Sequence, residues 1–209
     1  MTIKGLLFDL DGVIVSTEQN HYVAWKRTAD ELGIDFGHKE NEQLKGLSRV
    51  DSLKAILALA NKSIEQAYFD ELLHTKNEFY LQSIQELSKN DLLPGVMEVL
   101  ETAQQKGILL GVGSSSKNAP FILDLLGITS YFKIIVDGTM VDFPKPHPEV
   151  FLKGADALGI LPEECIVFED AASGIQAAKA GGFYAIAVGN KEIEHAGDAY
   201  LTDLTEFKF

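Results

Sequence analysis

The 209-residue sequence has one cysteine, Cys165, and far fewer basic than acidic side chains. A lone cysteine has no disulfide partner within the chain, and the apolar run Cys165-Ile166-Val167-Phe168 favours a core position over a nucleophile. The 18 Lys and Arg against 31 Asp and Glu give a formal net charge of −13. This argues against general binding to nucleic acid or anionic lipid, but it is compatible with a small phosphorylated ligand held by local donors and a divalent cation.

Long hydrophobic runs, repeats and low-complexity segments are also missing. No stretch reaches the roughly 18 apolar residues of a membrane-spanning helix, and the N-terminus enters an apolar strand without a charged leader. We therefore expect no membrane span, no signal peptide and a cytoplasmic location. With 46% hydrophobic and 23% charged residues, the composition fits one compact domain or a core with an insertion.

The first half of the chain is predicted to be helical after one short strand. The apolar run Ile3–Phe8 is expected to form that strand. Apolar residues at helical spacing then predict three helices, over Glu18–Leu32, Arg49–Leu59 and Ser63–Leu87. The segment Asn41–Arg49 has mixed polarity and a glycine, and it is predicted to be a functional loop.

From Leu93-Pro94-Gly95 onward, helices alternate with short apolar strands. Helices are predicted over Val96–Gln105, Pro120–Leu126, Pro148–Leu158 and Gly174–Ala180, and strands over Ile108–Gly113, Ile134–Val136, Cys165–Phe168 and Tyr184–Gly189. This alternation predicts an α/β fold, a doubly wound parallel sheet with helices on both faces. Ligands of such sheets bind at the carboxyl ends of the strands, and four polar residues are expected there: Asp9, Asp11, Ser114 and Asp170.

Two carboxylates stand two residues apart where the first strand ends, in Asp9-Leu10-Asp11-Gly12. Residues i and i+2 of a strand share a face, so both side chains are predicted to point toward one centre. Because two acids this close repel each other, the pair indicates a bound cation, a shared proton or a catalytic task. The alternative is an ordinary strand end followed by an Asp-Gly turn.

Three further segments place reactive side chains at strand ends or in restricted loops. Lys145 lies between two prolines that restrict the backbone, although loop lysines usually face solvent. Glu169 and Asp170 follow an apolar strand, and the alternative is an acidic loop start. Ser114 follows another strand near a helix start, where N–H groups favour an anion; the alternative is an N-cap serine.

These segments, Asp9-Leu10-Asp11-Gly12, Ser114, Lys145-Pro146 and Glu169-Asp170, resemble in order and spacing the four motifs of the haloacid dehalogenase superfamily of phosphotransferases. The resemblance covers nearly the whole chain. It implies a Rossmann-like catalytic core formed by residues 1–16 and 88–209, and an inserted α-helical cap domain formed by residues 17–87.

The resemblance also implies a role for each core residue. Asp9 would be the nucleophile that forms an aspartyl phosphate, and Asp11 the general acid and base. Lys145 would neutralise Asp9 and the phosphoryl group, to which Ser114 would donate a hydrogen bond. A Mg²⁺ cofactor would be held by Asp9, the Asp11 carbonyl, Glu169 and Asp170.

Within the superfamily the chain most resembles the β-phosphoglucomutases, through the helical insertion and the segments 41–49 and 114–118. The substrate-binding residues that this resemblance implies are His21, Trp25, Gly46, Leu47, Ser48, Arg49, Ser52, Lys76, Ser115, Ser116, Lys117 and Asn118. Singly, each has an ordinary alternative: Arg49 as a surface charge, Trp25 as cap core, and His21 as a residue that packs against Trp25. The Ser16-Thr17 pair departs from the family, which commonly carries an Asp at this hinge.

The implied activity is that of a Mg²⁺-dependent phosphomutase, an isomerase that interconverts β-D-glucose 1-phosphate and glucose 6-phosphate through an aspartyl phosphate and glucose 1,6-bisphosphate. Its ligand would be a small sugar phosphate, with no nucleic acid or membrane partner, and we expect a monomer. One alternative is a sugar-phosphate or phosphoglycolate phosphatase of the same fold. Another is a catalytically weak phosphosugar-binding protein, against which the four intact motifs argue.

Overall fold

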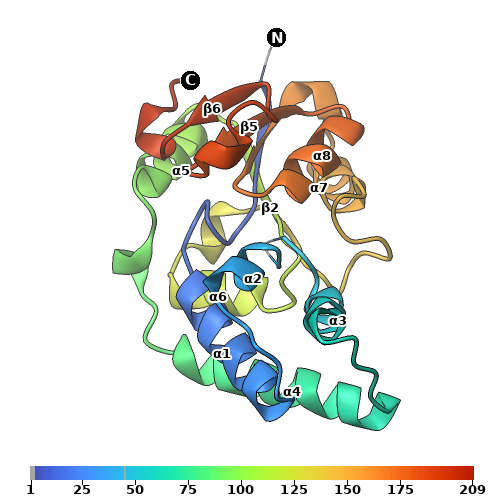
Figure 1. The fold of residues 1–209 in the computed structure, drawn as a ribbon. Coiled ribbons are helices and arrows are strands. Elements are labelled where there is room, and N and C mark those ends of the chain that lie inside the picture. The colour runs from blue at the N-terminus through green and yellow to red at the C-terminus, as the bar shows by residue number, and fades with distance from the viewer. Residues whose placement is uncertain (1–2, 45) are drawn as a thin grey trace. The chain divides into compact units, whose positions relative to one another are not determined.

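The computed structural model describes residues 3–44 and 46–209. Lys45 of the predicted loop, and Met1 and Thr2 of the predicted core, lie outside these residues. The chain forms two compact units (Figure 1). One combines the segment up to Ser16 with Leu87–Phe209, and the other is Thr17–Glu86.

The first unit is built on a parallel sheet. Its strands are β1 (Gly5–Phe8), β2 (Leu109–Gly113), β3 (Ile134–Val136), β4 (Cys165–Glu169), β5 (Tyr184–Val188) and β6 (Ala199–Leu201). Their order across the sheet is β3-β2-β1-β4-β5-β6, and every neighbouring pair is parallel. The central strands β1 and β4 are buried along their whole length, as expected of strands covered on both faces.

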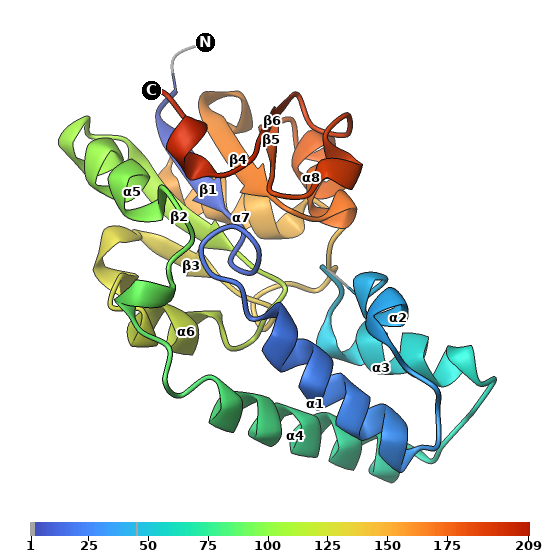
Figure 2. The same ribbon diagram turned by 60° about the vertical axis from the view of Figure 1, so that its left-hand side comes forward.

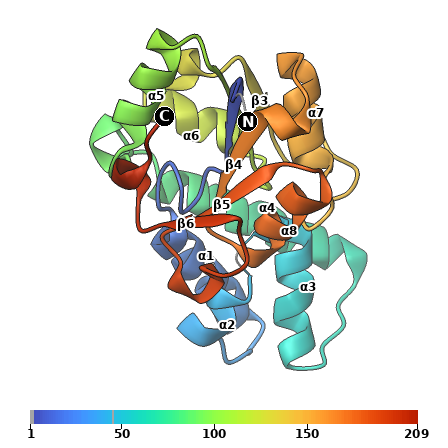
Figure 3. The same ribbon diagram turned by 90° about the horizontal axis from the view of Figure 1, so that it is seen from above.

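Helices cover both faces of this sheet, as Figures 2 and 3 show, with α5 and α6 on one face and α7 and α8 on the other. These helices are α5 (Val96–Gln105), α6 (Ala119–Leu125), α7 (Glu149–Leu158) and α8 (Ala172–Ala180). Phe151 of α7 and Ile175 of α8 join Leu7 and Val167 of the central strands in one buried apolar cluster. The doubly wound parallel sheet predicted from the alternating pattern is confirmed.

The strand order creates a topological switch point beside β1. Strands β2 and β3 lie on one side of β1, and β4, β5 and β6 lie on the other. In open α/β sheets, ligands bind outside the carboxyl ends of the strands at such a point. Asp9 directly follows β1 and Glu169 ends β4, so the fold brings two acids from distant parts of the sequence to this edge.

The second unit consists of α1 (Glu18–Glu31), α2 (His38–Glu42), α3 (Arg49–Leu59) and α4 (Gln66–Ser83), of which α1 and α4 pack side by side (Figure 1). It has its own apolar core, to which Trp25 and Leu53 belong. Ser48 caps α3 by accepting the Asp51 N–H at 3.1 Å, which explains why that helix begins at Arg49. Among the described helices, none is long and apolar enough to cross a membrane.

Three predictions of secondary structure need correction. The loop expected over Asn41–Arg49 starts later, because its first two residues end α2. The helix expected over Ser63–Leu87 is shorter at both ends; at its C-terminus the Ser83 hydroxyl donates to the Tyr80 carbonyl, which competes with further helical bonds. Strand β6 was not predicted, because Ala199-Tyr200-Leu201 is a three-residue edge strand without the β-branched residues that mark β3. Short 3₁₀ turns lie at Lys89–Asp91, Thr129–Tyr131, Pro162–Glu164, Lys191–Ile193 and Leu204–Glu206.

Candidate active site

Asp9 lies at the first position after β1 and is 7% exposed. Its N–H donates to the Phe168 carbonyl at 2.9 Å, so the β1–β4 pairing continues into this residue and fixes its backbone. Asp11 lies in the following turn, where Gly12 adopts a left-handed φ of 82°. A Cβ at position 12 would overlap the Asp170 carboxylate, so glycine is required here both by the backbone and by the space.

Lys145 reaches Asp9 from the loop between β3 and α7. Its ammonium donates to Asp9 Oδ1 at 2.5 Å and to Glu169 Oε1 at 2.6 Å. It also lies 4.7 Å from the centre of the Phe151 ring, and only 1% of the lysine side chain is exposed. The alternative of a solvent-facing loop lysine is therefore excluded.

These buried charges shift one another's proton affinity. Burial raises the pKa of Asp9 to about 7, because the carboxylate loses its water; Lys145 opposes this rise and Glu169 adds to it. For Lys145, burial acts to lower the pKa, but the charges of Asp9 and Glu169 outweigh it and hold the pKa above its usual value. Lys145 is therefore a fixed cation, whereas the charge of Asp9 depends on its surroundings.

Three carboxylates gather at this edge of the sheet. Among the described residues, ligand oxygens of Asp9, Glu169 and Asp170 all lie within 4.8 Å of one another. Carboxylate oxygens are the donors that Mg²⁺ and similar hard cations prefer, so the residues fit a divalent metal site. The Asp11 carboxylate is outside this group, and its predicted contribution is the backbone carbonyl.

Two residues to which the sequence analysis gave no role position these acids. Asn190, after β5, donates from Nδ2 to the Asp170 carbonyl at 3.1 Å. Gly174, in α8, lies so close to Glu169 that a Cβ at this position would overlap the carboxylate. That carboxylate also accepts the Ala171 N–H on Oε2 at 2.8 Å. No pattern in a single sequence marks an asparagine or a helical glycine for such a task; only the tertiary contact does.

Ser114 follows β2 at the same edge of the sheet and is 2% exposed. Its N–H donates to the Val136 carbonyl at 2.9 Å, and its Oγ accepts the Ser116 N–H at 3.0 Å. Ser116 Oγ accepts the Asn118 N–H at 3.2 Å, so the segment is a tight turn leading into α6. A hydroxyl that accepts in this way keeps its own hydrogen for donation. The remaining predicted residues of this turn are Ser115, which is partly buried, and Lys117, which is exposed.

In the helical unit, Lys76 of α4 is buried among aromatic rings. Its ammonium lies 2.8 Å from His21 Nδ1, 4.5 Å from the centre of the Trp25 ring and 4.8 Å from the centre of the Tyr80 ring. His21 stacks on Tyr80, and the Tyr80 hydroxyl lies 2.9 Å from Thr17 Oγ1. The hinge threonine thus shares a hydrogen bond with the ring that supports His21.

His21 is neutral in this cluster. Burial, with the nearby charges of Lys76 and Arg49, holds the pKa of His21 well below its usual value. A neutral ring that accepts the Lys76 ammonium at Nδ1 carries its proton on Nε2, which makes Nε2 a hydrogen-bond donor.

The other predicted residues of this unit lie on the loop and on α3. Arg49 is the first residue of α3, and partial burial lowers its pKa. Gly46 has a left-handed φ of 75°, which permits the turn before this helix. Ser52 is 4% exposed and Trp25 is 3% exposed, so both belong to the interior of the unit. Leu47 and Ser48 are partly buried.

Comparisons with known proteins agree with this geometry. Residues 3–182 match the family model for haloacid dehalogenase-like hydrolases. The chain belongs to this family. Its relatives include the β-phosphoglucomutase of Bacillus subtilis, which is 42% identical over 90% of this chain and 84% of that protein. Fructose-1-phosphate phosphatase YqaB of Escherichia coli is 33% identical over 88% of this chain and 95% of that protein. A crystal structure of β-phosphoglucomutase from Clostridium difficile has a TM-score of 0.96 and 38% identity, and covers 100% of this chain and 94% of that one.

In this haloacid dehalogenase-like hydrolase, the fold brings most of the predicted motif residues to one edge of the sheet. The fold brings Asp9, Lys145 and the Glu169-Asp170 pair together and places Ser114 after the neighbouring strand. The helical unit brings Lys76, His21 and Trp25 into one cluster. Their roles in binding and catalysis stay predictions. Cys165 is fully buried, and burial raises its pKa to about 12, which confirms its expected place in the core.

Proposed function

We propose that this haloacid dehalogenase-like hydrolase is a metal-dependent phosphomutase that interconverts β-D-glucose 1-phosphate and glucose 6-phosphate. The observation that carries phosphoryl transfer in this proposal is the buried contact of Lys145 with both Asp9 and Glu169. An anionic carboxylate attacks an anionic phosphate readily only when fixed positive charge lies beside both. Lys145 supplies that charge at the strand end where the candidate nucleophile lies.

The proposed metal is Mg²⁺, held by Asp9, Glu169, Asp170 and the Asp11 carbonyl. When bound, it supplies a second positive charge to the phosphoryl oxygens. The hydrogen bond from Asn190 to the Asp170 carbonyl helps to keep one of these acids in place. Ser114 donates its hydroxyl hydrogen to the phosphoryl group.

The chain's own side chains then move the phosphoryl group and the proton. An Asp9 oxygen bonds to phosphorus while the bond from phosphorus to the sugar oxygen breaks, and Asp11 donates a proton to that departing oxygen. In the reverse half-reaction, Asp11 takes the proton of the acceptor hydroxyl. The acceptor oxygen bonds to phosphorus as the bond from Asp9 breaks. When the acceptor is the 6-hydroxyl of β-glucose 1-phosphate, this transfer forms glucose 1,6-bisphosphate. The 1-phosphate of that intermediate then passes to Asp9 by the first step, which releases glucose 6-phosphate and restores the aspartyl phosphate.

The helical unit supports a sugar hydroxyl, rather than water, as the acceptor. A mutase must bind a second, non-reacting phosphate, and this unit holds Lys76 and Arg49 as candidate cations. Partly buried His21 offers a neutral donor at Nε2 for a sugar oxygen. The Bacillus subtilis relative, a β-phosphoglucomutase, agrees with this choice.

The alternative is a sugar-phosphate phosphatase. Asp9, Asp11 and Lys145 serve transfer to water as well as transfer to a sugar, and the Escherichia coli relative is a fructose-1-phosphate phosphatase. The core chemistry is common to both activities, so only the acceptor separates them.

Isomerisation and phosphate release, measured side by side on β-glucose 1-phosphate, test the proposal. Wild-type protein is expected to isomerise faster than it hydrolyses. Arg49→Ala should weaken binding of the non-reacting phosphate by about 1.5–3 kcal/mol, as when a charged hydrogen bond is lost, and should reduce isomerisation more than hydrolysis.

Lys54→Ala is the matched control, because it removes a positive charge from the same helix at a side chain that is 65% exposed. It should change neither rate. Hydrolysis that exceeds isomerisation in the wild type, or an unchanged ratio of the two rates in Arg49→Ala, would favour the phosphatase.

A further inference from the structure

Lys145 lies on a loop whose position is not explained by the packing of buried apolar side chains alone. The segment between β3 and α7 has no regular secondary structure, and two of its apolar side chains face solvent: Met140 is 43% exposed and Phe143 is 60% exposed. The Lys145 ammonium nevertheless has to stay within hydrogen-bond distance of Asp9 and Glu169. Polar contacts must therefore fix the loop.

The first residue of α7, Glu149, supplies these contacts. Its Oε2 accepts the Phe143 N–H at 2.9 Å, and the carboxylate accepts the Asp142 N–H at 3.2 Å. Its Oε1 lies 2.7 Å from Lys153 Nζ, one turn further along the helix. Lys153 also donates to the Met140 carbonyl at 2.6 Å. The acid and the lysine together bind three consecutive peptide groups of the loop, through the Met140 carbonyl and the N–H groups of Asp142 and Phe143.

The same helix supports Lys145 from its other side. Phe151 of α7 is fully buried, and its ring centre lies 4.7 Å from the Lys145 ammonium. Glu149 and Lys153 bind the loop backbone over residues 140–143, just before Lys145 in the chain. The Phe151 ring of the same helix packs against the Lys145 ammonium.

We propose that Glu149, with Lys153, is a positioning residue that fixes the loop so that Lys145 reaches Asp9 and Glu169. Glu149 does not itself touch the reacting groups. The inference rests on the proposed function only for what Lys145 does in the reaction, because the placement of Lys145 is measurable without substrate.

The charge of Glu149 suits this task. Hydrogen bonds from Lys153 and from the loop N–H groups lower the pKa of Glu149 to about 2. The carboxylate therefore stays ionised, and keeps all its acceptor positions, throughout the pH range in which the protein would work.

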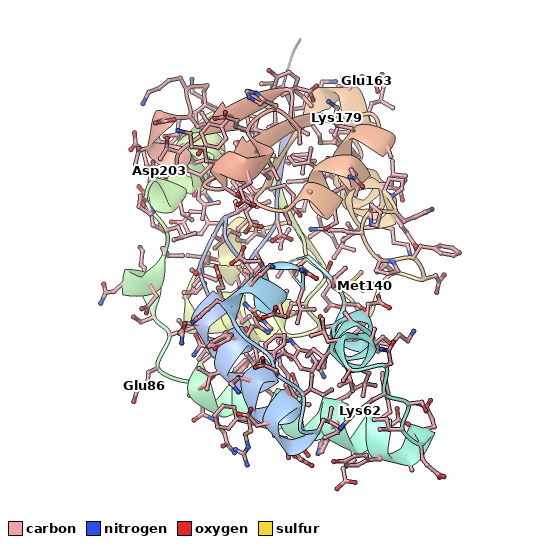
Figure 4. The ribbon with its side chains drawn as sticks, in the orientation of Figure 1. Lys62, Glu86, Met140, Glu163, Lys179 and Asp203 are labelled. Carbon is pink, nitrogen blue, oxygen red and sulfur yellow. The ribbon has the colours of Figure 1, made fainter. Side chains whose placement is uncertain are left out.

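The chain contains a matched control for this arrangement. Glu164 Oε2 accepts the Leu161 N–H at 3.2 Å, and Glu164 Oε1 lies 2.5 Å from Lys4 Nζ. It is the same combination of a carboxylate, a loop N–H and a lysine. Figure 4 shows its neighbour Glu163 well apart from Met140 within the same unit. Glu164→Gln should therefore disturb contacts of the same kind without reaching Lys145.

The experiment is reductive methylation of the folded, substrate-free protein, followed by mass spectrometry of the peptide that carries Lys145. In the wild type, where 1% of this side chain is exposed, Lys145 should be protected. Glu149→Ala should lose the protection, Glu149→Gln should lose part of it because one acceptor oxygen remains, and Glu164→Gln should keep it. Lys153→Met should resemble Glu149→Gln.

Steady-state kinetics provide the second readout. Misplacement of a catalytic group by about 1 Å lowers the rate by up to about 10²-fold, so Glu149→Ala should lower kcat by that order while KM changes little.

Full protection of Lys145 in Glu149→Ala, or equal loss of protection in Glu164→Gln, would overturn the inference. Loss of protection in Glu149→Ala, together with no isomerase activity in the wild type, would instead overturn the proposed function and leave the inference standing.

Discussion

At the scale of single residues, Asp9 decides how the site responds to pH. Its carboxylate is buried beside Lys145 and Glu169, and burial raises its pKa to about 7. A protonated carboxylate is a poor ligand for a divalent cation, so protons and metal compete for Asp9 near neutral pH. The proposed nucleophile and the proposed metal site are therefore coupled through one ionisation.

We predict that Mg²⁺ affinity rises between about pH 6 and pH 8, by up to about tenfold per pH unit below the pKa of Asp9. The folded-state pKa lies above the ordinary value of 3.8, so the native protein binds more protons than the unfolded chain in this range. Without metal, it should lose stability as pH rises from about 4, near the unfolded pKa, to about 7, the folded pKa. Isothermal titration calorimetry at several pH values measures the affinity, with Asp9→Asn as the control that lacks the ionisation. A flat affinity in the wild type would contradict the assignment.

At the scale of secondary-structure elements, the junction of β4 and α8 sets the geometry of the acids. Glu169 ends the strand, and Gly174 lies in the first turns of the helix that follows. The missing side chain of Gly174 leaves the volume that the Glu169 carboxylate occupies. From there the carboxylate reaches both Lys145 and the Ala171 N–H.

Gly174→Ala should therefore weaken Mg²⁺ or Mn²⁺ binding by about 10–100-fold, the range seen when a residue that orients a metal ligand is changed. If the substitution acted only on the helix itself, the protein would become more stable, because alanine favours a helix by about 1 kcal/mol over glycine. Gln176→Ala, at an exposed position of the same helix, is the control and should leave metal binding unchanged. Calorimetry measures the metal affinity of both variants, and thermal unfolding measures their stability. A Gly174→Ala protein of higher stability and unchanged affinity would refute the proposed role of Gly174.

At the scale of the whole molecule, the chain divides into two units with separate apolar cores. Leu53 and Trp25 belong to the core of the helical unit, whereas Leu7 and Phe151 belong to the core beneath the sheet. The carboxylate cluster lies entirely within the sheet unit. Loss of packing in the helical unit should therefore leave the proposed metal ligands in place.

Leu53→Ala tests this division. The side chain is fully buried, so its truncation should destabilise the helical unit by about 2–5 kcal/mol. Hydrogen exchange measured by mass spectrometry should show lost protection in residues 17–86, while Mg²⁺ affinity stays at the wild-type value. Leu100→Ala, at a fully buried position of α5, should give lost protection in the sheet unit instead. Equal loss of protection in both units by Leu53→Ala would show that they unfold together.

The sequence alone determined the order of elements and the identity of the motif residues. Apolar runs and their periods located every strand of the sheet except β6, and helices such as Arg49–Leu59 and Val96–Gln105 agree with the structure to the residue. These features are local, because each depends on neighbours within a few positions of the chain. The motifs Asp9-Leu10-Asp11-Gly12 and Glu169-Asp170 were likewise visible as charged residues at the ends of apolar runs.

Only the tertiary structure decided the contacts, the burial and the supporting partners of these groups. Lys145 becomes a buried partner of Asp9 and Glu169 through parallel pairing of β1 with β4 and through a loop fixed by Glu149, none of which follows from spacing. Gly174 and Asn190 act through their distance to acids elsewhere in the fold. The pKa of Asp9 is set by burial, which is a property of the packed molecule. Contacts between distant segments depend on how the whole chain packs, and so the sequence could name the reactive residues but could not give their charge states or their supporting partners.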